Sequence, residues 1–348
     1  MVLSLLVGIF IWTRYFQPWD LPPTNLENSA AEPASDTQVR FLELSTGSRI
    51  AYRHHSPENE AISSSPVIFL HGGPGLAEWP RSEAVLELNR LGLHVYGFHQ
   101  FGGGLSSRAK APHLEYTIDR QVRDLEDFRK TLNVESWILV GQSWGGALAA
   151  HYTAAFPERV QGLILTAPAP VWLPAFGMEA ISSIQRLSPQ TQEALRLLIQ
   201  PKIPRLAFHR RLAARNPASA DRLIDEEDYA AFIAAQTRLS VQSLACDPEK
   251  ASGLSFPHQG GLVHRYLFAD MHRIDDVRPK LRGLRVPVLL MQPECDFVDP
   301  DVVAEYEELF PLARRHLIQG AGHEIQLERP HIYRELLVDF LKSLETSP

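Results

Sequence analysis

One short segment of this chain has the residue types and spacing of a reactive serine. GQSWG, residues 141–145, places Ser143 between two glycines, directly after the apolar run 136–141 and before an alanine-rich run. Gly-x-Ser-x-Gly between a strand and a helix is typical of a nucleophile elbow, a sharp turn that exposes the serine hydroxyl. The glycines are needed because bulkier side chains would collide beside such a turn. We therefore predict that Ser143 is a nucleophile.

A serine hydroxyl becomes a good nucleophile only with a base beside it, and the base needs an acid to orient it. After an elbow of this kind the acid and then the histidine follow late strands. Asp296 ends the segment VPVLLMQPECD and His323 ends HLIQGAGH, so we predict them in these roles. Glu294 and Asp299 flank Asp296 and remain alternatives for the acid.

An acyl-transfer site also needs backbone N–H groups that hold the negative charge of the tetrahedral intermediate. One donor is the amide after the nucleophile, which is Trp144 here. The second comes from the loop after an earlier strand, where HGGPG, residues 71–75, follows PVIFL. We choose Gly73, because a donor amide so close to a substrate is best placed on a residue without a Cβ atom.

The elements that must position these residues follow from apolar runs that alternate with amphipathic segments. The predicted strands cover residues 39–45, 49–54, 66–71, 93–99, 136–141, 159–168, 285–292 and 314–320. The predicted helices, besides the one after Ser143, cover residues 82–91, 117–132, 299–310 and 326–344. This order is typical of an α/β fold, a mostly parallel sheet with helices on both faces. Between the two parts of this core, 39–169 and 283–348, the segment 170–282 is mainly helical, which predicts an inserted helical cap.

Charge and cysteine content bear on the partners of the chain. The net charge is −7 without a block of basic residues, so we expect no nucleic acid as a partner. The two cysteines, Cys246 and Cys295, fit no metal-binding spacing. We interpret them as two separate structural thiols, with a disulfide as the alternative.

The N-terminal residues are predominantly apolar. MVLSLLVGIFIW, residues 1–12, would cover roughly 18 Å as a helix, less than a hydrocarbon core of about 30 Å. With Arg14 extended toward the surface and aromatic residues at the interface, residues 1–19 nearly span a bilayer. We expect a membrane anchor here; the alternatives are a signal peptide or a plain hydrophobic extension, the last with a cytoplasmic location. Residues 20–38, rich in Pro, Ser, Ala and acids, predict a linker.

Together these motifs resemble the α/β-hydrolase superfamily and, within it, the prolyl aminopeptidase (proline iminopeptidase) family. The similarity covers residues from about 40 to 345 and rests on HGGPG, DLEDFRKTLNVESWILVGQSWGGALA, CDFVDP and GAGH. The resemblance implies an α/β-hydrolase fold and a serine hydrolase with no metal and no cofactor. It also implies the roles already predicted for Ser143, Asp296, His323, Gly73 and Trp144, with His323 acting first as base and then as acid.

The loop after the fourth strand departs from that family. The family usually carries Asp-Gln-Arg-Gly-x-Gly-x-Ser there, and this chain has HQFGGGLS, residues 99–106. His99 replaces the acid and Phe101 replaces the arginine, while Gln100 is kept. We therefore expect a different charge network in this loop.

The cap is the second departure. Family aminopeptidases hold the free α-amino group of the substrate with two acids of the cap. Our alignment places Gln236 at the first acid, with Phe232 at a tryptophan of the same segment, and Val263 at the second acid. We predict that these three residues contact substrate. The acidic cluster DEED, residues 225–228, could replace the missing acids, but we interpret it as the solvated start of a helix.

The predicted function is that of a serine hydrolase that acts on a small molecule or a short peptide through an acyl-enzyme. Two versions stay open: an aminopeptidase that releases N-terminal proline or a similar residue, and an esterase or amidase with an uncharged substrate. A non-catalytic binding protein on the same scaffold is a further alternative, although such proteins generally lack part of the triad.

Overall fold

The structure, a computed structural model, describes residues 38–59, 65–251, 254, 256 and 258–345. The predicted anchor at residues 1–19 lies outside this range, as does the predicted linker up to residue 37. Among the helices of the described ranges, none combines the length and the apolar character that crossing a membrane requires.

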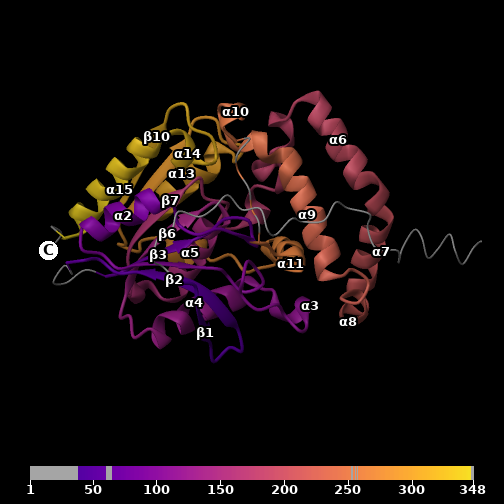
Figure 1. Ribbon diagram of the computed structural model, residues 1–348, viewed down its shortest axis with the longest axis horizontal. Helices are drawn as coiled ribbons and strands as arrows, with labels where there is room; N and C mark the ends of the chain where they lie inside the picture. The colour runs from indigo at the N-terminus through magenta and orange to yellow at the C-terminus, as the bar shows by residue number, and fades with distance from the viewer. Residues whose placement is uncertain (1–37, 60–64, 252–253, 255, 257, 346–348) are drawn as a thin grey trace, which may run out of the picture.

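A central eight-stranded sheet organises the molecule (Figure 1). In spatial order its strands are β1 (Arg40–Glu43), β2 (Arg49–His55), β5 (Val95–Phe98), β3 (Val67–Leu70), β6 (Trp137–Gln142), β7 (Val160–Thr166), β9 (Val288–Pro293) and β10 (Ala313–Ile318). β2 runs antiparallel to both β1 and β5, and all other neighbours in this sheet are parallel. All eight predicted strands are present, and the mostly parallel sheet is confirmed.

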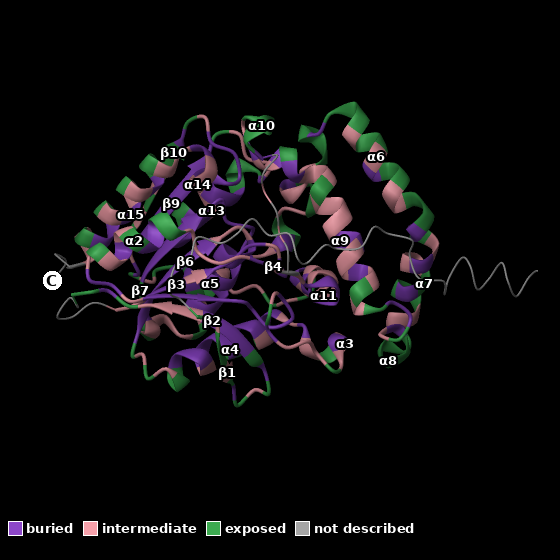
Figure 2. Ribbon diagram, in the orientation of Figure 1, coloured by how far each residue is buried: buried purple, intermediate pink, exposed green. Residues whose placement is uncertain are grey.

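Helices cover both faces of the sheet. In β6, Trp137 and Leu139 belong to one hydrophobic core, whereas Ile138 and Val140 belong to the other. The first core is completed by α4 (Ile118–Thr131), α5 (Trp144–Ala155) and α13 (Pro300–Leu309), the second by α2 (Ser82–Arg90) and α15 (Pro330–Glu345). Because successive side chains of a strand point to opposite faces, an inner strand covered on both sides must be apolar throughout. The inner strands β3, β5, β6, β7 and β9 are accordingly buried along most of their length (Figure 2).

Between β7 and β9 the chain is mainly helical. Its elements there are η2 (Leu173–Ala175), η3 (Met178–Ile181), η4 (Ile184–Arg186), α6 (Pro189–Ile199), η5 (Gln200–Lys202), α7 (Ile203–Ala213), α8 (Pro217–Ala220), α9 (Glu226–Ser240), η6 (Val241–Leu244), α10 (Pro248–Ala251), α11 (Gly261–Met271) and α12 (Arg278–Leu281). α6 to α9 lie at one end of the molecule, away from the sheet, and α6 is largely exposed (Figures 1 and 2). Two other short helices lie in the first part of the chain: α3 (Pro112–Glu115) precedes α4, and η1 (Pro157–Arg159) follows α5.

A two-stranded sheet links this helical segment to the loop after β3. β4 (Leu76–Ala77) pairs antiparallel with β8 (His258–Gln259), and the Gly260 N–H donates to the carbonyl of Gly75 at 2.9 Å. Sequence patterns do not predict this sheet, because two residues are too few to show an alternation.

One predicted helix is divided in two. The sequence predicts a single helix over 326–344, whereas the structure has α14 (Ile325–Glu328) and then α15. Arg329, between them, has φ −133° and ψ 54°. Pro330 explains this break, because proline disfavours helical backbone at the residue before it. Glu328 therefore ends α14, close to the loop that carries His323.

Candidate active site

Ser143 occupies the corner between the end of β6 and the start of α5. Its backbone has φ 53° and ψ −118°, a conformation that costs a non-glycine residue roughly 1–3 kcal/mol. The Ser143 N–H donates to the carbonyl of Thr166 at 3.0 Å. The Ser143 carbonyl accepts from the N–H groups of Gly146 and Ala169, both at 2.9 Å. These bonds hold the strained corner that the sequence predicts.

The glycines on either side of Ser143 are required by close backbone contacts. A Cβ atom on Gly141 would lie 2.5 Å from the carbonyl oxygen of Gly145. A Cβ atom on Gly145 would overlap the carbonyl of Leu70, at the end of β3. Both collisions are with backbone atoms, which cannot turn aside as a flexible side chain can. The prediction that these glycines clear space for the serine is confirmed.

Asp296 and His323 lie together in loops after β9 and β10. The Nδ1 atom of His323 donates to Oδ1 of Asp296 at 2.8 Å, and each of these side chains is 5% exposed. The two alternatives for the acid have other partners. Glu294 accepts from the Gly320 N–H at 2.7 Å, and Asp299 caps α13. Of the three carboxylates, Asp296 is the one that contacts His323.

The surroundings of His323 favour its protonated form. Burial by itself lowers the pKa of the imidazole, but the charge and hydrogen bond of Asp296 and the charge of Glu324 raise that pKa above its usual value. With Nδ1 bonded to a carboxylate, the neutral ring keeps its lone pair on Nε2. His323 thus has the tautomer and the basicity of a proton acceptor.

The two predicted oxyanion donors lie on adjacent segments. Trp144 is the first residue of α5, so its N–H has no partner within the helix. Gly73 has φ 121°, a backbone conformation that favours glycine, and is joined to Pro74 by a cis peptide bond. A Cβ atom on Gly72 would lie 3.3 Å from Cβ of Ser143, so this loop runs beside the serine.

The residues next to the serine and the histidine are also bonded. The Gln142 side chain donates to Oε1 of Glu324 at 3.4 Å, which links the residue before Ser143 to the residue after His323. The structure therefore brings together the four segments that the sequence selects for chemistry: the loop of Gly73, the turn of Ser143 and the loops of Asp296 and His323. Comparison with known sequences then decides the family: a sequence model of the alpha/beta hydrolase fold matches residues 65–330. The chain belongs to the α/β-hydrolase fold family.

Several individual relatives agree with this assignment. The hydrolase is 24% identical over 316 residues to a proline iminopeptidase of Heyndrickxia coagulans, covering 87% of this chain and 98% of that one. It is 25% identical over 317 residues to the (lyso)-N-acylphosphatidylethanolamine lipase of Mus musculus, covering 88% of this chain and 87% of that one. A proline iminopeptidase-related protein from Thermus thermophilus shares the fold, with a TM-score of 0.61 and 20% identity over 89% of this chain and 99% of that chain. This chain is accordingly an enzyme, a serine hydrolase of the same superfamily.

A buried hydrogen-bond network, which sequence reasoning missed, fixes the loop of Gly73 to the start of α5. These two segments carry the predicted oxyanion donors. The Trp144 indole donates to Oε1 of Gln100 at 2.8 Å, and the Gln100 amide donates to the carbonyl of His71 at 2.9 Å. The Gln100 N–H also donates to Nε2 of His71 at 3.1 Å. Burial lowers the pKa of His71 to about 4, so its ring is neutral and can accept this bond. Gln100, which this chain shares with the prolyl aminopeptidases, was the available indication.

In the loop after β5, aromatic residues stand at the two positions where the resemblance implies an acid and an arginine. His99 is buried; its Nδ1 accepts from the Leu105 N–H at 3.0 Å, and its ring stacks on Trp79 with 3.7 Å between centroids. Phe101 is buried, with the Arg120 guanidinium 4.7 Å from its ring centroid. These are the contacts that the two replaced residues make; that the charge network of this loop differs from that of the family stays a prediction.

The three predicted substrate contacts of the hydrolase lie in different surroundings. Val263, on α11, is 1% exposed and packs against Gly75 and Gly102, where a Cβ atom on either glycine would come within 2.7 Å of it. Phe232, on α9, is 4% exposed, with its ring 5.7 Å from that of Tyr229. Gln236 lies one helical turn beyond Phe232 and is half-buried. Of the three, the structure places Val263 against the loop of Gly73.

The interpretation of residues 225–228 is wrong in part. Asp225 caps α9, as a helix start requires. Glu226, however, is partly buried and accepts from the N–H groups of Gly261 (2.7 Å) and Leu262 (2.9 Å), so it caps α11. Its role depends on the packing of α11 against α9, which the local sequence does not reveal.

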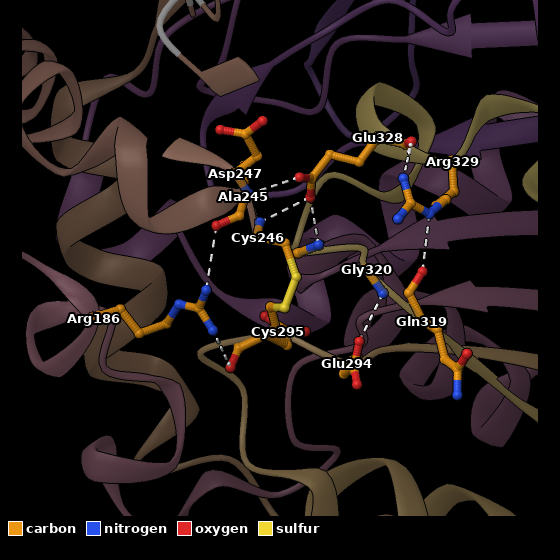
Figure 3. Close-up of a disulfide and its surroundings, with 12 residues drawn as sticks. Arg186, Ala245, Cys246, Asp247, Glu294, Cys295, Gln319, Gly320, Glu328 and Arg329 are labelled. Atoms are coloured by element: carbon orange, nitrogen blue, oxygen red, sulfur yellow. Dashed lines mark hydrogen bonds between the residues drawn. A yellow bond between two sulfur atoms is a disulfide. The ribbon is translucent and has the colours of Figure 1, made fainter. Parts of the chain in front are cut away.

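The interpretation of the cysteines as separate thiols is wrong. Cys246 and Cys295 form a disulfide, with their Cα atoms 5.2 Å apart (Figure 3). They are 49 residues apart in sequence, and only the tertiary structure brings them together. Within the described residues, the group with the spacing of a metal site is Cys246, Cys295 and Glu294, and its two sulfurs are bonded to each other rather than free as thiolates.

Proposed function

We propose that this hydrolase cleaves an ester or amide with an uncharged acyl group through an acyl-enzyme on Ser143. The observation that carries the proposal is the combination of a serine at φ 53° on a strand–helix corner with a buried Asp296–His323 pair. Each of these features is costly to maintain, the first in backbone strain and the second in desolvation. A serine hydrolase uses both.

The proposed reaction follows from these roles. His323 takes the hydroxyl proton of Ser143 on Nε2 as the serine oxygen attacks the substrate carbonyl. The Gly73 and Trp144 amides donate to the oxyanion, and Asp296 stabilises the imidazolium. His323 then gives its proton to the leaving group, which leaves the acyl group on Ser143. A water activated by the same histidine hydrolyses the acyl-enzyme and restores the hydroxyl.

The proposal of an uncharged substrate rests on the cap carboxylates. Five carboxylates in the described part of residues 170–282 are at least partly buried, and each has a hydrogen-bond or ion-pair partner. They are Asp221, Glu226, Asp228, Asp270 and Asp276. Glu226 is the one bonded beside the loop of Gly73, and it already holds two N–H groups of α11 and an ion pair with Arg108 at 3.5 Å. A substrate ammonium group buried without a free carboxylate would pay a large desolvation penalty.

One observation favours an aminopeptidase as the second candidate. Burial and the charge of Glu324 raise the pKa of Glu78 to about 8. The ionised form of Glu78 would be stabilised by a cation beside it, such as the free amino group of a peptide. Glu324 directly follows His323, so such a cation would lie near the site.

A matched pair of substrates tests the two candidates. We expect hydrolysis of p-nitrophenyl butyrate, and kcat/KM for N-acetyl-proline p-nitroanilide at least equal to that for proline p-nitroanilide. A clear preference for the free amine, lost in Glu78→Gln, would establish the aminopeptidase instead. Ser143→Ala should abolish both turnover and fluorophosphonate labelling, while Ser45→Ala, in the exposed turn between β1 and β2, should change neither. Labelling that persists in Ser143→Ala would refute the proposed nucleophile.

We also propose that residues 1–19 attach the hydrolase to a membrane, with a cytoplasmic location as the alternative. The apolar run supports attachment, and the Cys246–Cys295 disulfide supports a compartment that does not keep thiols reduced. Fractionation of cells that express the full chain tests this. We expect recovery with membranes after a carbonate wash; recovery in the soluble fraction would contradict it.

A further inference from the structure

The disulfide joins the helical segment to the loop that carries Asp296. Cys246 follows η6, and Cys295 directly precedes Asp296 (Figure 3). The Arg186 guanidinium lies across the same junction and donates to the carbonyl of Ala245 (3.2 Å) and to that of Asp296 (3.2 Å). One covalent bond and two hydrogen bonds therefore fix these two segments to each other.

Glu328 ties the same cap segment to the loop of His323. Its carboxylate is buried and accepts from the N–H groups of Cys246 (2.9 Å), Asp247 (2.9 Å) and Gly322 (2.6 Å). Figure 3 shows the carboxylate reaching to the backbone beside the disulfide. Gly322 directly precedes His323, so one side chain holds both the cap segment and the histidine loop.

Backbone hydrogen bonds also join the histidine loop to the other two segments. The Cys295 N–H, in the loop of Asp296, donates to the carbonyl of Ala321 at 2.9 Å. The Glu324 N–H donates to the carbonyl of Leu244, in the cap segment, at 3.1 Å. The disulfide thus lies at the meeting point of three segments, residues 244–247, 294–296 and 321–324. Asp296 and His323 lie on two of them, and the cysteines link the third to the acid.

We propose that the Cys246–Cys295 disulfide is a positioning element of the active site, which holds the Asp296 loop where Asp296 can orient His323. This rests on the roles proposed above for Asp296 and His323. Neither cysteine contacts the reacting atoms; Cys295 acts through its peptide bond to Asp296. The Arg186 hydrogen bonds would survive loss of the bridge, but Arg186 is exposed, so water competes for both acceptors. The covalent bond has no such competitor.

Reduction of the bridge is a balanced step that can be controlled in the test. A dithiol attacks one sulfur as a thiolate, breaks the S–S bond and forms a mixed disulfide. Its second thiol then displaces the protein sulfur. The protein gains two electrons and two protons as two thiols, and the reductant ends as a cyclic disulfide. Because the chain has only two cysteines, the dithiol has no other target in it.

The experiment compares full-length oxidised protein, dithiothreitol-treated protein and the double variant Cys246→Ala, Cys295→Ala. Active sites are titrated with a fluorophosphonate, so that kcat for p-nitrophenyl butyrate is given per reactive serine and unfolded molecules do not count. We expect kcat per site to fall about 10- to 100-fold on reduction and in the double variant, with KM nearly unchanged, because small misplacements of catalytic groups cost this much. Reoxidation should restore kcat per site of the reduced protein to its original value, and dithiothreitol should not change kcat of the double variant.

The pH profile separates positioning from stability. If Asp296 moves away from His323 when the disulfide is lost, the acidic limb of the kcat/KM profile should move to lower pH, because Asp296 raises the pKa of His323. A purely stabilising disulfide would lower the number of titrated sites but leave kcat per site and the limb unchanged, and that result would overturn the proposal. Oxidised protein that takes up no fluorophosphonate would instead refute the proposed function.

Discussion

The Nδ1 atom of His323 lies 2.8 Å from Oδ1 of Asp296, with both side chains almost wholly withdrawn from water. Burial strengthens the interaction between carboxylate and imidazole, because little solvent screens it. Oδ1 of Asp296 also accepts from the Phe297 N–H at 2.7 Å, which fixes the carboxylate relative to its own backbone. The ring of His323 is therefore oriented by one group, and its orientation can be tested one residue at a time.

Substitution of Asp296 by asparagine should lower kcat by about 10³- to 10⁴-fold, because an amide cannot hold the same tautomer or stabilise the imidazolium. Asp299→Asn is the matched control, since Asp299 caps α13 and asparagine is also a good cap. Its kcat should stay close to that of the wild type. Steady-state kinetics on a neutral ester measure both variants, and equal losses in the two would refute the assignment of the acid.

The activity on a neutral ester should fall as the pH drops through the pKa of His323, because only the unprotonated ring can accept the serine proton. Since that pKa is raised, the midpoint of kcat/KM should lie above about pH 6.5. His71 and His264 lie near the loop of Gly73, but their pKa values of about 4 keep them neutral over this range. A profile of kcat/KM against pH checks this, and a midpoint well below 6.5 would contradict it.

Gly145→Ala should lower the free energy of unfolding by about 1–3 kcal/mol or prevent folding, because the new methyl group would overlap the carbonyl of Leu70. Gly103→Ala is the control: its Cβ atom would meet its nearest neighbours at 3.4 Å, an ordinary contact. Denaturant unfolding of the two variants compares these costs. Similar stabilities would show that the turn around Ser143 can relax.

Glu328→Gln should lower both the melting temperature and kcat. The carboxylate accepts three N–H groups, whereas an amide turns an NH₂ group toward one of those donors, which costs about 1–3 kcal/mol for a buried N–H left unpaired. The N–H groups of Cys246 and Gly322 share Oε2, so the amide oxygen takes that place and the NH₂ group meets the Asp247 N–H. The side chain must shift to avoid this contact, which loosens its bond to Gly322 in the loop of His323. Glu335→Gln, at an exposed position of α15, should change neither quantity. Thermal unfolding and turnover, measured together, decide the matter.

Local patterns in the sequence predict a large part of this architecture. The inner strands are apolar because both of their faces are buried, so their positions along the chain could be predicted. Ser143 could be predicted because its strand, turn and helix are contiguous. Asp296 and His323 follow from chain order, because loops at the carboxyl ends of parallel strands meet at one edge of the sheet.

Pairings between distant segments could not be predicted in this way. The Cys246–Cys295 bond joins residues 49 apart, and Glu226 caps a helix that begins 35 residues later, so neither leaves a periodic pattern. The same holds for the bonds from Gln100 to His71 and Trp144. The sequence by itself predicted the reactive serine, the segment that holds the acid, the base and the sheet that carries them, because each prediction depends on neighbours along the chain. The tertiary structure decided which carboxylate meets His323, how the cap acids are used and that the cysteines are bonded, because these depend on distances that exist only after the helical segment packs against the sheet.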